Sequence, residues 1–100
     1  MNNALPVYEN YRRIASISSH MLDAARAGRW DEVKQLERDC ARVIVDLRLA
    51  MIGVEVDDEL QALRMNTLRE VLHHDAEIRS IAEPGWDRLF SMGSGGSPPL

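Results

Sequence analysis

The sequence predicts an all-α protein: an antiparallel three-helix bundle, followed by a short C-terminal helical segment and a disordered tail. The apolar residues are mainly Leu, Ile, Val, Ala and Met, and the chain of 100 residues holds few aromatic residues and six glycines, a composition that favours helices. In three separate stretches these apolar residues recur at steps of three and four, which is helical spacing. A chain of this length forms one small domain that buries roughly 60–65% of its unfolded surface, so a deep enclosed active site is not expected.

The first helix is expected over residues 6–27, after a flexible N-terminus of residues 1–5. Pro6 suits the first helical position because proline lacks the N–H group that would be unpaired there. Gly28 supplies the left-handed backbone position at which helices often end, and Arg26 places a cation near the negative end of the helix dipole. The turn before Trp30 is very short, which makes the next helix an antiparallel neighbour.

The second helix is expected over residues 30–51, with Asp31 and Glu32 as favourable negative charges in its first turn. Its apolar positions form a seam that faces other helices along its whole length, and they are Val33, Leu36, Cys40, Val43, Leu47 and Ala50. Gly53 ends the pattern, and the stretch IGVEVDD is interpreted as a connector that covers one end of the bundle. The run AGRWDEVKQLE is similar to the start of a tetratricopeptide helix pair, but no second copy follows at that period.

The third helix is expected over residues 58–82. Asp58 and Gln61 have the spacing of a capping box at its start. Pro84 and Gly85 end it, because proline removes a backbone donor and disfavours helical geometry at the residue before it. A short amphipathic helix is expected over residues 86–92, and the sequence GSGGSPPL over residues 93–100 is expected to be disordered.

The charge pattern excludes several classes of function. The net charge is −4 and the acidic and basic residues are mixed, which argues against a nucleic-acid surface with its concentrated Lys and Arg. No stretch has the apolar length of a membrane span, and the N-terminus does not have the pattern of a secretory signal. The single cysteine, Cys40, fits a reducing compartment, so a cytoplasmic location is expected.

The stretch VLHHDAEIRS raises the question of metal binding or acid–base catalysis. His73 and Glu77 lie four residues apart on one helical face, the spacing of two metal ligands, but further ligands would have to come from scattered residues. We therefore expect these two side chains to face solvent, His74 to be half-buried with one hydrogen bond, and no metal or other cofactor. Asp75 falls on or beside the apolar stripe, where it either pairs with Arg79 or lines a groove. Motifs of common enzyme classes are absent, so no catalytic residue is assigned.

Two longer runs carry a resemblance to a known family. They are YRRIASISSHMLDAARAGRWDEVKQLERDCARVIVDL and LRMNTLREVLHHDAEIRSIAEPGWDRLFSM. With a Tyr-x-x-Ile register in the first helix, a Gly-x-Trp-Asp turn and an acidic residue before the last apolar turns of the third helix, residues 8–92 resemble the flagellar export chaperone family FliT.

The resemblance implies a helical protein without catalytic activity that binds the filament-capping protein FliD in the cytosol. Such proteins prevent premature assembly of FliD and deliver it to the flagellar type III export apparatus. In some bacteria they also bind the flagellar master transcription regulator and oppose expression of class 2 operons, and some members are homodimers. After Pro84 and Gly85 only about two helical turns precede the glycine–serine tail, so we expect no full-length regulatory fourth helix here.

A bundle of three helices leaves a groove in which the amphipathic helix of a partner can lie. We expect the second and third helices to form its walls, through Leu36, Cys40, Val43, Leu47, Leu68, Val71, Leu72, Asp75 and Ile78. Trp86, Leu89 and Phe90 are a candidate lid. The alternative is a helical interaction or oligomerisation module unrelated to flagella, whose apolar seams serve only to pair helices.

Overall fold

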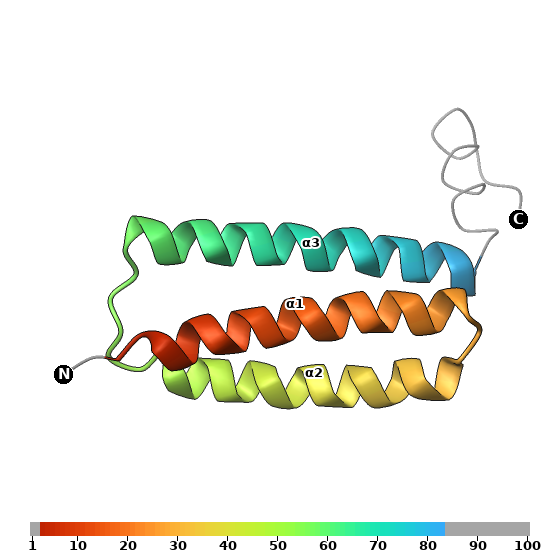
Figure 1. Ribbon diagram of the computed structural model, residues 1–100, viewed down its shortest axis with the longest axis horizontal. Coiled ribbons are helices and arrows are strands. Elements are labelled where there is room, and N and C mark those ends of the chain that lie inside the picture. Colours follow the sequence, from red (N-terminus) through yellow and green to blue (C-terminus); the bar gives the residue numbers. More distant parts are fainter. Residues whose placement is uncertain (1–2, 84–100) are drawn as a thin grey trace, which may run out of the picture.

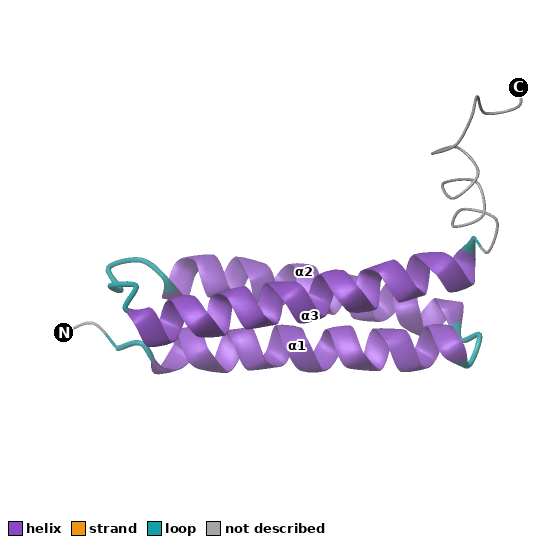
Figure 2. Ribbon diagram, turned by 90° about the horizontal axis from the view of Figure 1, so that it is seen from above, coloured by secondary structure: helices purple, strands orange, loops and turns teal. Residues whose placement is uncertain are grey.

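A computed structural model describes residues 3–83 of the chain, and these residues form three long helices. They are α1 (Leu5–Arg26), α2 (Trp30–Ala50) and α3 (Asp58–Ala82). The helices run side by side, with α2 antiparallel to the other two (Figures 1 and 2). The predicted all-α three-helix architecture is confirmed for this part of the chain. The short helix expected over residues 86–92, the tail over 93–100 and the candidate lid lie outside the described residues.

The helix α1 starts and ends at residues that explain its limits. The N–H group of Leu5 donates to Asn3 Oδ1 at 3.0 Å, and Pro6 lies in the first turn, where it needs no backbone partner. Gly28 has a φ of 75°, a left-handed conformation that glycine takes readily because it lacks a Cβ atom, and this conformation turns the chain toward α2. The helix spans Leu5–Arg26, where residues 6–27 were expected.

The connector between α2 and α3 and the start of α3 differ in detail from the expectation. The cap of α3 is Asp57, not Asp58, and its Oδ1 accepts a hydrogen bond from the N–H group of Leu60 at 2.8 Å. Of the apolar connector residues, Val54 packs on the core, whereas Ile52 is 76% exposed and Val56 is also exposed. Of the three residues Ile52, Val54 and Val56, only Val54 therefore helps to cover this end of the bundle, together with Met51 at the end of α2.

The core includes two clusters at opposite ends of the helices, and Ile14, Leu22 and Val43 are buried outside them. At the end that carries the 51–57 connector, Val7, Tyr11 and Leu60 form the connector-end cluster. At the end that carries the 27–29 turn, Ala24, Ala25 and Val33 form the turn-end cluster. Each cluster is completed by partly buried side chains from all three helices: Tyr8, Leu47, Ala50, Met51, Val54 and Leu63 at the first, and Met21, Leu36, Ile78 and Ile81 at the second.

The helix α1 lies between the other two (Figure 1). It packs against both α2 and α3, whereas no Cα atom of α2 lies within 8 Å of a Cα atom of α3. Between the two end clusters, α2 and α3 are therefore separate walls with α1 beneath them. None of the three helices is long and apolar enough to cross a membrane.

Candidate partner-binding groove

An apolar groove runs between α2 and α3 over the surface of α1. It consists of two adjoining hollows of about 250 and 270 Å³. The first is lined by Ser18, Met21, Glu37, Cys40, Ala41, Ile44, Val71, Asp75 and Ile78, and the second by Tyr11, Ile14, Ile44, Arg64, Thr67, Leu68 and Val71. Because Ile44 and Val71 line both hollows, we treat them as one central groove.

The floor of the central groove belongs to α1. Tyr11, Ile14 and Ser18 are all less than 10% exposed, so they are fixed by packing on their other sides. Ser18 Oγ also forms a hydrogen bond of 2.9 Å with His74 Nδ1, which ties the middle of α1 to α3. The floor is thus held by a polar contact as well as by apolar packing.

The walls of the central groove keep large apolar side chains in contact with solvent. Leu68 on α3 is 50% exposed and Ile44 on α2 is 37% exposed, and they face the groove from opposite walls. Exposed apolar side chains that gather in one concave site are typical of interaction surfaces, whereas single exposed ones are ordinary. The groove is therefore the strongest candidate for a site that receives another apolar surface.

The nine groove residues predicted from the sequence fall into two groups. Cys40, Leu68, Val71, Asp75 and Ile78 line the central groove. The others lie elsewhere: Leu36 and Leu47 pack against the end clusters, Val43 is 2% exposed and lines a different hollow, and Leu72 is 59% exposed beside the lining residues. Burial raises the pKa of the Cys40 thiol, in agreement with its position among apolar side chains.

Several groove residues were not predicted. The residues of α1 were missed because the first helix was treated only as support, although the repeat Tyr11, Ile14, Ser18 already marks a face of small and apolar residues at steps of three and four. Ile44 was seen only as widening the seam. Glu37 and Arg64, at opposite ends of the groove, had no sequence signal that separates them from other surface charges.

The polar side chains around Glu77 on α3 form pairs with one another and with α1. Glu77 accepts a hydrogen bond from Arg26 Nη2 at 2.6 Å, and His73 Nε2 lies 3.0 Å from its other oxygen. The hydrogen bond from Arg26, and then the charges of Arg26, His73 and His74, lower the pKa of the Glu77 carboxyl. Among residues 3–83 no three side chains of His, Cys, Asp or Glu are grouped so that they could hold a metal ion.

Asp75 combines the two roles that the sequence left open. Its Oδ2 accepts a hydrogen bond from Arg79 Nη2, one turn along α3, and the same side chain lines the central groove. The pair is exposed, so its contribution to stability is small. Its position at the rim of the groove matters more than its contribution to the fold.

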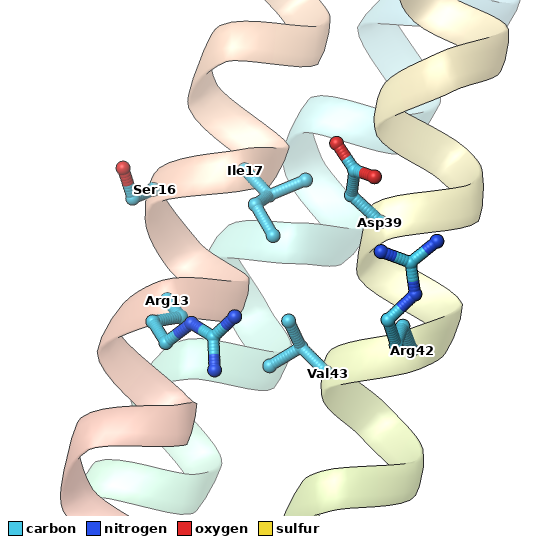
Figure 3. Close-up of a pocket in the computed structure, with 6 residues that line it drawn as sticks. All are labelled: Arg13, Ser16, Ile17, Asp39, Arg42 and Val43. Atoms are coloured by element: carbon cyan, nitrogen blue, oxygen red, sulfur yellow. The ribbon is translucent and has the colours of Figure 1, made fainter.

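A third hollow of about 310 Å³ lies between α1 and α2, and it is charged (Figure 3). Ile17 and Val43 point into it from the two helices, with Arg13 on α1 and Asp39 and Arg42 on α2 around them. Arg13 lies 3.9 Å from Asp46, and Asp39 accepts a hydrogen bond from Gln35. This hollow lacks the apolar walls of the central groove, since three of its six lining side chains are charged.

Comparison with known proteins places the chain in a family. The model of the family described as "Flagellar protein FliT" matches residues 8–92. A flagellar protein FliT of Photorhabdus laumondii is 27% identical over 92% of this chain and 74% of its own length. Those of Pectobacterium atrosepticum and Serratia proteamaculans are each 24% identical, over 84% and 82% of this chain and 67% of their own lengths. No solved structure matches the chain. Since the family model matches α2, α3 and all of α1 from Tyr8 onward, the chain belongs to the FliT family of flagellar proteins.

Proposed function

We propose that this protein is a cytoplasmic export chaperone for the filament-capping protein FliD, and that the central groove holds an amphipathic helix from the C-terminal segment of FliD. The observation that supports the proposal is the groove itself. It presents large apolar side chains from α2 and α3 over a buried floor, and α2 and α3 do not close over it. Membership of the FliT family supports a role in the flagellum.

The mechanism is one of binding alone. An amphipathic helix lays its apolar face into a groove through side chains at positions i, i+3 or i+4, and i+7. The apolar face is then covered until the chaperone releases it, so the bound segment cannot associate with other copies of the cap protein. Delivery to the export apparatus follows if the complex, and not the free chaperone, is recognised there. Such a function needs no catalytic residue.

The direct test is to measure binding of the purified chain to the C-terminal segment of FliD from the same organism by calorimetry. We expect a complex with one segment for each groove. Failure to form a complex at about 50 μM, which corresponds to a binding free energy of about −6 kcal/mol, would refute the proposal. The same assay with the export apparatus components and with the flagellar master transcription regulator tests the further partners that family membership suggests.

A further inference from the structure

Two charged residues stand at opposite ends of the central groove, on opposite walls. Glu37 on α2 lines the hollow near the turn-end cluster, and Arg64 on α3 lines the hollow near the connector-end cluster. Within residues 3–83 neither side chain has a hydrogen bond or an ion pair with another residue. The other acidic residue that lines the groove, Asp75, is paired with Arg79. The groove is thus apolar along its length, with an unpaired anion at one end and an unpaired cation at the other.

We propose that this arrangement fixes both the charge pattern of the bound helix and its orientation in the central groove. The helix that fits carries a basic side chain beside Glu37 and an acidic side chain beside Arg64, at the two ends of one apolar stripe. This inference rests on the proposed function, because it describes the segment that the same groove binds. It goes further in that it states which sequences the groove accepts and which it rejects.

The length of the groove sets the spacing of those two charges. Arg64 and Ile78 mark the two ends on α3 and are 14 positions apart in the sequence. At about 1.5 Å per residue, this distance is about 21 Å, or about four helical turns of the bound segment. The base and the acid of the partner are therefore separated by about four turns, with apolar side chains on the same face between them. Charges placed in this way decide orientation and partner choice more than they decide affinity.

Both charges are exposed at the groove rim, which limits the size of the effect. An exposed ion pair contributes little to affinity, and reversing one charge replaces attraction by repulsion. We expect each of Glu37→Lys and Arg64→Glu to weaken binding of the FliD C-terminal segment about three- to tenfold in about 50 mM salt. The difference from the unmodified chain should shrink in about 300 mM salt, since the ions screen exposed charges.

Matched controls are available on the same bundle. Glu70→Lys and Arg69→Glu make the same changes of net charge at exposed positions of α3 that do not line the groove. We expect them to leave the dissociation constant within about twofold of the unmodified chain, since they remove no contact with the segment. Circular dichroism of each variant shows whether the helices remain folded, which is expected because all four positions are exposed.

The orientation is tested by a rescue. The double variant Glu37→Lys, Arg64→Glu should bind the natural segment worst, and it should recover when the acidic and basic residues of the segment are exchanged. If the natural segment binds but the groove variants behave as the controls do, the orientation is wrong while the proposed function stands. If the segment does not bind the unmodified chain, both fail. If the groove variants instead change the sedimentation of the chain alone, the groove holds a second copy and the inference is overturned.

Discussion

Three leucines separate the contribution of the core from that of the central groove. Leu60 on α3 is 2% exposed in the connector-end cluster, Leu68 lies two turns further along the same helix and is 50% exposed in the groove, and Leu49 on α2 is 64% exposed outside both. Each is replaced by Ala, so the same atoms are removed in three environments. Stability is measured by urea unfolding, and binding by calorimetry with the FliD C-terminal segment.

The magnitudes follow from the exposed fractions. Leu60→Ala removes a fully buried side chain, which costs about 2–5 kcal/mol of folding free energy and lowers Tm by at least about 8 °C. Complete burial of a leucine side chain contributes about 1.5–3 kcal/mol. The exposed half of Leu68 therefore contributes about 0.8–1.5 kcal/mol if the segment covers it, so Leu68→Ala should raise Kd about 4- to 12-fold. The buried half of Leu68 contributes a similar amount to folding. Leu68→Ala should therefore lower the folding free energy by less than Leu60→Ala does.

The control decides the interpretation. Leu49→Ala should leave Kd unchanged and should change the folding free energy by no more than about 1 kcal/mol. Most of the Leu49 side chain is in water with or without the segment. The reasoning is refuted if Leu68→Ala changes Kd no more than Leu49→Ala does. It is also refuted if the folded fraction of Leu60→Ala loses as much affinity as Leu68→Ala, since binding would then depend on the core and not on the groove.

Four further results are expected. Burial raises the pKa of the Cys40 thiol above its ordinary value of 9.0, so iodoacetamide should label it slowly at neutral pH and faster as the pH rises. A segment bound in the groove should slow the labelling further. Equal labelling rates with and without the segment would contradict the binding of the segment beside Cys40. Glu77→Gln should destabilise the protein at neutral pH. The lowered pKa of the Glu77 carboxyl in the folded state stabilises the fold above pH 4.5, its ordinary pKa, and this stabilisation is lost as the pH falls through the folded-state pKa. The difference in stability between the variant and the unmodified chain should therefore vanish at the acid end of their pH-unfolding curves. Asp57→Ala removes the cap of α3 and should cost about 0.5–2 kcal/mol in urea unfolding, whereas the same change at Asp58 should cost less. Truncation after Glu83 tests the candidate lid, since a lid that covers the groove would make the shortened chain bind the segment more tightly, and an unchanged Kd would exclude it.

The sequence was a good guide to the helices because their signals are local. A helix boundary depends on residues within one turn of it. Pro6 and the aspartates before Leu60 lie at helix starts, and Gly28 lies just after a helix end. The pair of Asp75 and Arg79 was also readable, since residues four apart on a helix are neighbours in any fold. The cap of α3 was displaced by one residue because two aspartates stand side by side and only the geometry chooses between them.

The site was harder to predict because periodicity shows which face of a helix is apolar but not which neighbour that face meets. Val43 and Cys40 belong to one seam, yet Val43 is buried against α1 while Cys40 opens onto the groove. The ion pair of Arg26 with Glu77 joins α1 to α3, which are separated in the sequence by α2. No local sequence pattern predicts this pair. The floor of the groove was missed for the same reason.

The central position of α1 also bears on how such a sequence can diverge. Away from the two end clusters, a substitution on α2 must fit α1, and so must one on α3, but neither needs a matching change on the other outer helix, since the two helices share packing in those clusters and their Cα atoms stay more than 8 Å apart. Along the groove, packing therefore couples α1 to two neighbours and each outer helix to one. We expect correlated substitutions among relatives to pair positions of α1 with α2 or with α3. Direct pairs between α2 and α3 are expected within the two end clusters, where their side chains share one core. Pairs between groove-lining positions of α2 and α3 should arise only where a common ligand imposes them, so those pairs would map the bound helix.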